Sequence, residues 1–188
     1  SRRQRQMCIR DRRTVRISNG VDFDTVPLRK TINNNSSPTL HLIGVAEVHY
    51  WHGYDRLIHG LGEYYRQYHD KEIYFHIVGG VWKSEMYHSQ HAPGFHELIT
   101  HYHIEKQVIF HGQKMGKELD ELFDLADFAI GSLARHRSHI DKIKTLKNRE
   151  YAARGIPFIY SETDEDFDRM PYICLLYTSP SPRDPKTS

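Results

Sequence analysis

The sequence predicts an α/β fold in which strands and helices alternate along the chain. Short apolar runs of strand length recur, and most precede a segment whose apolar residues have helical spacing. The connections between these segments are short. Strands separated by helices pair in parallel through right-handed crossovers, so the pattern predicts one Rossmann-like parallel sheet flanked by helices.

The first part of the chain supplies most of the predicted strands. A short strand precedes the turn at Asn19-Gly20, and 31–38 is a polar loop. The elements expected next are a buried strand over 40–46, an amphipathic helix over 55–68, a strand over 73–78, a helix over 94–103 and a strand over 108–110.

The second part centres on a helix that ends at a glycine. A helix over 117–125 and a strand over 128–130 come first. The central helix, which includes 147–154, is predicted to end at Gly155, because glycine adopts the left-handed conformation and Pro157 cannot continue a helix. Ile156, Phe158 and Ile159 then suit a short covered strand.

The two ends of the chain differ in composition from its middle. Residues 1–12 are basic and without periodicity, and residues 174–188 form a tail rich in Ser, Pro and Thr. Both resemble translated sequencing-adapter read-through, so we expect non-native or disordered tails around a domain that spans 13–173. Cys8 and Cys174 both fall in these tails, so we expect neither a disulfide framework nor a thiolate metal site.

Composition argues against several functional classes. The formal net charge of +2 owes much to the Arg-rich start, and the nearly neutral remainder argues against broad nucleic-acid binding. No apolar run approaches the roughly 20 residues of a membrane span, and no signal peptide is visible. We therefore expect a cytoplasmic protein.

The loops after the predicted strands have the composition of a phosphate site. Ligands of parallel α/β sheets bind beyond the carboxyl ends of the strands. The loops at those ends are rich in Gly, His, Arg and Lys, and they span 45–53, 79–83, 111–114 and 132–145. Glycines allow close backbone approach, and cations and helix N-termini favour anions, so a phosphorylated ligand is predicted.

One carboxylate interrupts the apolar side of the central helix. Leu146, Glu150 and Ala153 lie at helical spacing, and an acidic residue among them is typical of a cleft rather than a core. The alternative is that Glu150 is solvated, or paired with Arg149 or Arg154.

These motifs together carry a resemblance to a known family. The chain between 13 and 173 resembles the C-terminal, nucleotide-sugar-binding half of a GT-B glycosyltransferase of family four, of the bacterial surface-polysaccharide type. The motifs occur in the expected order: Asn19–Asp22, Ile43–Ala46, Trp51–Ile58, Ile77–Gly80, Phe110–Gly112, Ala126–Ser132 and Leu146–Pro157.

The resemblance implies one half of a GT-B fold and a retaining, metal-independent transfer from a nucleotide-diphosphate sugar, with no cofactor. A saccharide or glycolipid acceptor would bind through an N-terminal domain that this chain lacks, so we expect a partial enzyme. The full enzyme would work in the cytoplasm, with possible peripheral association at the inner face of the membrane. The alternative is a standalone nucleotide- or sugar-phosphate-binding module that acts with a separate acceptor-domain subunit.

The resemblance also assigns residues. Glu150 would bind the ribose hydroxyls, within a donor-nucleotide set of Glu150, Gly44, Gly79, Gly80, His111 and Gly112. The family's acidic residue near the transferred sugar falls at Lys142, and its diphosphate cations fall at Val45 and His52. Arg135 is one source of compensating charge. The predicted diphosphate-binding residues are Thr145, Leu146, Lys147, Arg137 and Lys83. His52 and Lys147 are the predicted catalytic residues.

The fourteen histidines raise one alternative, a zinc site. The candidates are His88, His91, His96, His101 and His103. The segment contains neither a cysteine ligand nor two histidines with an intervening glutamate on one helix, so we expect ordinary surface histidines and no metal.

Overall fold

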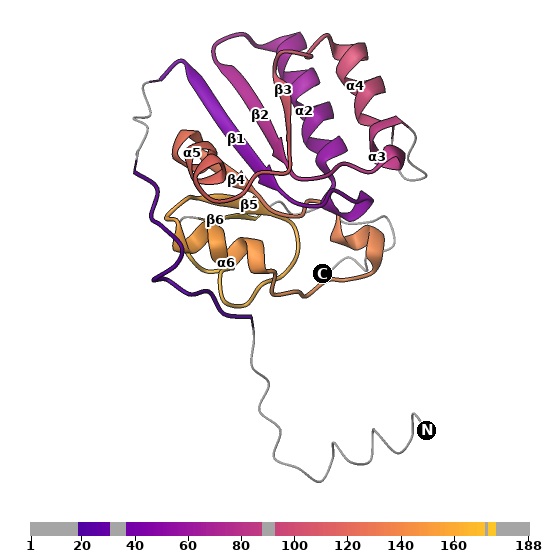
Figure 1. The fold of residues 1–188 in the computed structure, drawn as a ribbon. Helices are drawn as coiled ribbons and strands as arrows, with labels where there is room; N and C mark the ends of the chain where they lie inside the picture. The colour runs from indigo at the N-terminus through magenta and orange to yellow at the C-terminus, as the bar shows by residue number, and fades with distance from the viewer. Residues whose placement is uncertain (1–18, 31–36, 88–92, 172, 176–188) are drawn as a thin grey trace, which may run out of the picture.

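The computed structural model describes residues 19–30, 37–87, 93–171 and 173–175. Six parallel strands form one sheet in the order β3-β2-β1-β4-β5-β6 (Figure 1). The strands are β1 (Thr39–Val45), β2 (Glu72–Val78), β3 (Val108–Gly112), β4 (Phe128–Ile130), β5 (Phe158–Tyr160) and β6 (Ile173–Leu175). This is the strand order of the Rossmann fold, which confirms the predicted class.

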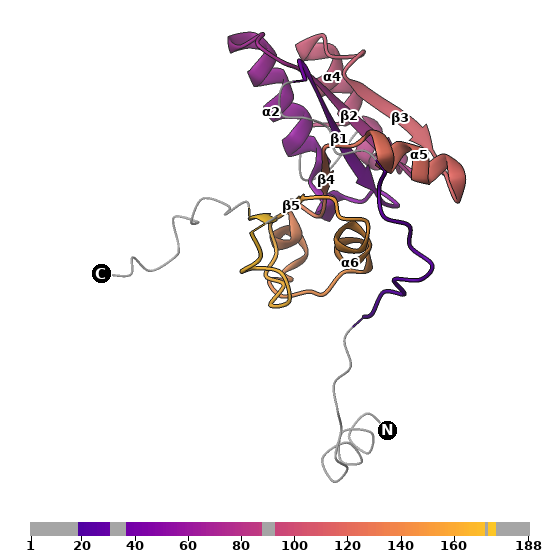
Figure 2. The same ribbon diagram turned by 90° about the vertical axis from the view of Figure 1, so that its left-hand side faces the viewer.

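Helices cover both faces of the sheet (Figure 2). The α-helices are α2 (Tyr54–Gln67), α3 (Lys83–Tyr87), α4 (Phe95–Tyr102), α5 (Lys117–Leu125) and α6 (Leu146–Ala153), with 3-10 helices η1 (Tyr50–His52) and η2 (Arg135–Ser138). Leu42 packs with α2 and α4 in one core cluster, whereas its neighbour Ile43 packs with α5 and α6 in the other. Neighbouring strand residues therefore serve opposite faces. In the described part of the chain, no helix is long and apolar enough to span a membrane.

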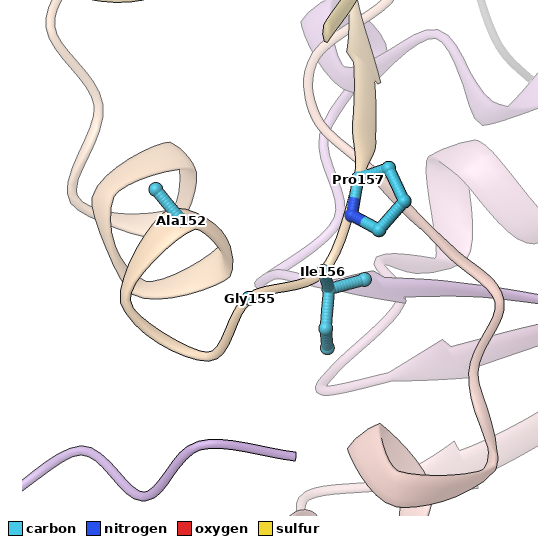
Figure 3. Close-up of a pocket in the computed structure, with 4 residues that line it drawn as sticks. All are labelled: Ala152, Gly155, Ile156 and Pro157. Atoms are coloured by element: carbon cyan, nitrogen blue, oxygen red, sulfur yellow. The ribbon is translucent and has the colours of Figure 1, made fainter. Parts of the chain in front are cut away.

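The end of α6 is a Schellman motif. Gly155 has a φ of 68°, its N–H donates to the Ala152 carbonyl at 3.0 Å, and the Ile156 N–H donates to the Tyr151 carbonyl at 3.0 Å. Pro157 then leads directly into β5 (Figure 3). Ala152, Gly155, Ile156 and Pro157 line a cavity of about 180 Å³ at this turn. The left-handed glycine thus turns the chain from the helix into the sheet, as the sequence predicts.

Most predicted elements are confirmed, and their boundaries agree within about two residues. Helix α3, the two 3-10 helices and β6 are not among the predicted elements. The expected strand before Asn19 lies outside the described residues. β6 ends at Leu175, so the expected domain boundary at residue 173 falls inside a strand.

Candidate functional site

Two strand-end loops meet at the switch point of the sheet. β1 and β4 are neighbours, but β1 leads to α2 on one face and β4 leads to α6 on the other. Such a switch point is where doubly wound sheets bind ligands. The Leu133 N–H donates to the His52 carbonyl at 2.8 Å, and a Cβ on Gly53 would lie 2.7 Å from that of Ala134. These contacts hold the two loops together.

His52 sits at this junction as a neutral hydrogen-bond donor. Its side chain is buried, and its Nδ1 accepts a hydrogen bond from the His49 N–H at 3.0 Å. A neutral ring with Nδ1 as acceptor carries its hydrogen on Nε2. Burial, followed by the charges of Lys147 and Arg135, lowers the pKa of His52 to about 2. The ring is therefore uncharged at neutral pH.

Lys147 brings a buried cation to the same place. It lies in the first turn of α6, and its Nζ is buried without a hydrogen-bond partner among the described residues. Burial lowers the pKa of Lys147 to about 7, against the opposing effect of Glu162, and Arg135 lowers it further. A buried ammonium without a hydrogen-bond partner is costly, so this arrangement suits an anionic ligand.

Other buried polar groups around Lys147 also lack partners within the described residues. They are the Ser132 hydroxyl, Arg135 Nε, the Thr145 hydroxyl, both amide atoms of Asn148 and both carboxylate oxygens of Glu162. We call these residues, with Lys147, the unpartnered cluster. They come from the loop after β4, η2, the start of α6 and the end of β5. Buried polar groups in folded proteins are normally satisfied by protein, water or a ligand, so their concentration here indicates a binding site.

The start of α6 adds backbone donors to the unpartnered cluster. Thr145 is the N-cap residue, but its hydroxyl makes no capping bond. The first N–H groups of a helix have no partner within the helix. Leu146 contributes only its backbone, because its side chain is 63% exposed. Thr145, Leu146 and Lys147 are thus brought together as predicted for a diphosphate, although their binding role stays a prediction.

The other two predicted diphosphate residues, Arg137 and Lys83, are not members of the unpartnered cluster. Arg137 forms a bidentate pair with Asp55, at 2.8 and 2.7 Å, and donates to the Tyr50 carbonyl at 3.0 Å. Its guanidinium therefore joins η2 to the loop and helix after β1. Lys83 is exposed on α3. Arg135 instead lies 5.7 Å from the centre of the Trp51 ring and belongs to the unpartnered cluster.

The predicted donor glycines mostly serve internal packing. A Cβ on Gly44 would lie 2.6 Å from the Tyr54 hydroxyl. One on Gly79, whose φ is 116°, would meet the Ala46 carbonyl, and one on Gly80 would meet the Glu47 carboxylate. Gly112, with a φ of 66°, has open space around it. Close approach of the chain to itself therefore explains three of these glycines without a ligand.

His111 ends a row of hydrogen-bonded imidazoles. His76 lies between His41, at 3.0 Å, and His111, at 2.9 Å. Burial is the main cause that lowers the pKa of His76 to about 4 and also lowers that of His111. This row holds the His111 ring beside Gly112, at the end of β3.

Glu150 is ion-paired and does not belong to the unpartnered cluster. Arg154 donates to one oxygen, Glu150 Oε1, from Nε at 3.0 Å and from Nη2 at 2.9 Å. Arg154 also binds Asp120 at 2.7 Å. The pairing with Arg154 was the alternative to a cleft carboxylate. Within the described residues, Oε2 makes no hydrogen bond, so the ribose role stays a prediction.

Three members of the cluster were missed by sequence reasoning as site residues: Ser132, Asn148 and Glu162. Ser132 and Glu162 each follow a buried strand at its carboxyl end, which is the one signal that could have identified them. Asn148 lies in α6 and is fully buried. Lys142, which replaces the family's acidic residue, is exposed and pairs with Glu165 at 3.4 Å.

That the protein binds no metal stays a prediction. Among the described residues, no group of three or more His, Cys, Asp and Glu side chains is arranged to hold a metal ion. His88 and His91 lie outside that part of the chain.

Comparison with known proteins identifies the fold. No family model and no curated protein matches the chain. Its structure is similar to the lipopolysaccharide outer core galactosyltransferase WaaB in its apo form, with a TM-score of 0.52 and 16% identity over 79% of this chain and 37% of that one. The C-terminal domain of the group 1 glycosyl transferase LpcC from Francisella tularensis gives a TM-score of 0.51 and 15% identity over 76% of this chain and 70% of that domain.

A third similar structure is Anabaena HepE in complex with UDP and glucose, with a TM-score of 0.48 and 16% identity, over 76% of this chain and 36% of that one. The chain thus spans little more than a third of the length of WaaB and HepE. At these identities the comparisons show the fold, which is that of one domain of solved GT-B glycosyltransferases.

Proposed function

We propose that this chain is the donor-binding domain of a glycosyltransferase and that the cationic and hydrogen-bond-donating members of the unpartnered cluster bind the diphosphate of a nucleotide sugar. The observation that carries the proposal is the buried Lys147 Nζ, without a hydrogen-bond partner in the described chain, at the N-terminus of α6. It lies at the switch point of a fold that solved glycosyltransferases share.

The available groups match a diphosphate. Lys147 and Arg135 supply positive charge, and the first turn of α6 supplies N–H donors. The His52 Nε2–H adds a neutral donor that needs no proton uptake. When a glycosidic bond to the diphosphate breaks, negative charge grows on the leaving phosphate oxygens, and preorganised cations and donors stabilise that charge. These groups take the part of a metal ion, so the proposed transfer is metal-independent, and by the resemblance it is retaining.

The nucleoside would extend away from the diphosphate towards Glu150. In this arrangement Glu150 Oε2 accepts a hydrogen bond from a ribose hydroxyl, while Oε1 still accepts the hydrogen bonds from Arg154. Gly112, at the open end of β3, leaves space for a base beside His111. The acceptor, a saccharide or glycolipid, would be held by a second domain on the cytoplasmic side of a membrane.

A thermal-shift panel tests the proposal. Nucleoside diphosphates, their monophosphates and the free nucleosides are compared with wild type, Lys147→Met and the exposed control Lys83→Met. We expect one diphosphate to raise the melting temperature of wild type and the control, but not of Lys147→Met, because ligands of the native state stabilise it by mass action. Equal shifts in all three proteins would place the phosphate outside the cluster, and the absence of any shift would refute nucleotide binding.

A further inference from the structure

We propose that Glu162 binds hydroxyl groups of the transferred sugar, beside the diphosphate, and so contributes to donor selectivity. This inference rests on the proposed function. Glu162 was not among the predicted site residues, and it is the acidic member of the unpartnered cluster.

The acidic turn after β5 distinguishes Glu162 from its neighbours. Each other acidic side chain between 162 and 168 has a partner: Asp164 and Asp166 pair with Arg149, Glu165 pairs with Lys142, and Asp168 accepts from the Tyr160 hydroxyl. Glu162 is 3% exposed, and neither carboxylate oxygen has a partner within the described residues. The turn thus uses its other carboxylates in side-chain contacts, whereas Glu162 forms no side-chain hydrogen bond or ion pair in the described chain.

The backbone holds Glu162 rigidly in place. On one side, the Ser161 N–H donates to the Ser132 carbonyl at 2.9 Å. On the other, the Thr163 N–H donates to the Asp141 carbonyl at 2.7 Å, and the Thr163 carbonyl accepts from the Ile143 N–H at 3.1 Å. Glu162 is therefore fixed between the loop after β4 and the segment before α6. A residue held in this way by the backbone is suited to recognition.

The charges around Glu162 determine which ligand group it can bind. Lys147 and Arg135 act on its carboxylate, but neither forms an ion pair with it in the described chain. A carboxylate next to a bound diphosphate repels the phosphate oxygens, so it cannot be a phosphate ligand. It can accept hydrogen bonds from neutral donors, and a sugar attached to the diphosphate offers adjacent hydroxyls. Burial raises the pKa of Glu162, against the opposing effects of the backbone N–H groups of Glu162 and Ser161 and of the charges of Lys147 and Arg135.

Calorimetric titration tests the inference. The probes are UDP with UDP-glucose and GDP with GDP-mannose, and the proteins are wild type, Glu162→Gln, Glu162→Ala and the exposed control Glu165→Gln. The quantity compared is the ratio of the Kd of the diphosphate to the Kd of its sugar conjugate, for the pair that binds. This ratio isolates the sugar contacts from the diphosphate contacts.

We expect the ratio to fall about tenfold in Glu162→Ala and less in Glu162→Gln, with diphosphate affinity unchanged or higher because a repulsive charge is gone. The control should keep the wild-type ratio. Both Glu162 variants should fold, since each removes a buried charge that forms no ion pair and whose burial is the largest cause of its raised pKa.

Two results would overturn the inference while leaving nucleotide binding intact. An unchanged ratio would mean that Glu162 does not contact the sugar. An equal loss of affinity for diphosphate and conjugate would mean that Glu162 acts only by positioning Lys147. If wild type binds no nucleoside diphosphate of the thermal-shift panel, the proposed function itself fails, and this inference fails with it.

Discussion

Replacing Lys147 with methionine should stabilise the empty chain while abolishing nucleotide binding. Methionine matches the unbranched apolar stem of lysine and removes the ammonium, whose Nζ is buried without a hydrogen-bond partner in the described residues. Binding sites often hold groups that are unfavourable for folding, so a substitution that destroys the site raises stability. An opposite sign would show that Lys147 is a structural residue.

The magnitude follows from the ionisation of Lys147. Its pKa falls from 10.5 to about 7 on folding. Each pKa unit corresponds to about 1.4 kcal/mol. The lowered pKa of Lys147 therefore reduces the free energy of unfolding at pH 7 by roughly 4 kcal/mol. Loss of the attraction to Glu162 offsets part of the gain. We therefore expect Lys147→Met to raise the free energy of unfolding by about 1–4 kcal/mol.

The pH dependence of the free energy of unfolding gives a second test of the buried ammonium. Between pH 7 and 10.5 the unfolded lysine holds its proton and the folded one releases it, so this contribution makes wild type more stable as pH rises. The advantage of Lys147→Met over wild type should shrink by about 2 kcal/mol from pH 7 to pH 9.

Urea unfolding at pH 7, 8 and 9 measures both effects, with the exposed Lys83→Met as the matched control. Because the comparison is a difference between proteins, titrating groups that do not interact with Lys147 cancel. A gain for Lys147→Met that stays constant with pH, or equal gains for both variants, would refute the reasoning about the buried ammonium.

Three further predictions follow from the neighbouring contacts. Glu150→Gln should weaken nucleotide affinity about tenfold and change the free energy of unfolding by less than about 1 kcal/mol, because Arg154 keeps Asp120; unchanged affinity with a large stability loss would make Glu150 structural. Arg149→Met should cost about 3–5 kcal/mol in urea unfolding, because it leaves the fully buried Asp164 unpaired, whereas the exposed Arg66→Met should cost little. A chelator should leave the calorimetric affinity for the nucleoside diphosphate unaltered, and loss of binding that Mg²⁺ restores would contradict a metal-independent site.

The sequence predicts the fold well because the evidence for it is local. The span of α5 follows from apolar spacing within nine residues, and the end of α6 follows from Gly155 and Pro157 alone. β6 was not predicted because Cys174 and Leu175 fall in the segment that we expected to be a tail, and its pairing with β5 is what makes it a strand.

The site is less accessible to sequence reasoning because it depends on which charges find partners. Arg135 and Arg137 are two residues apart in an Arg-rich segment, but only Arg137 forms an ion pair with Asp55. Glu162 likewise stands among similar acidic residues, and only tertiary contacts separate it from them. Local sequence does not encode these pairings.

The most direct test of the central claim is a crystal structure of the chain with the nucleoside diphosphate that binds most tightly. We expect diphosphate oxygens within hydrogen-bond distance of Lys147 Nζ and the first N–H groups of α6, with the His52 Nε2–H directed at the same anion. A diphosphate bound at exposed lysines such as Lys83, with Lys147 Nζ still unpartnered, would contradict it.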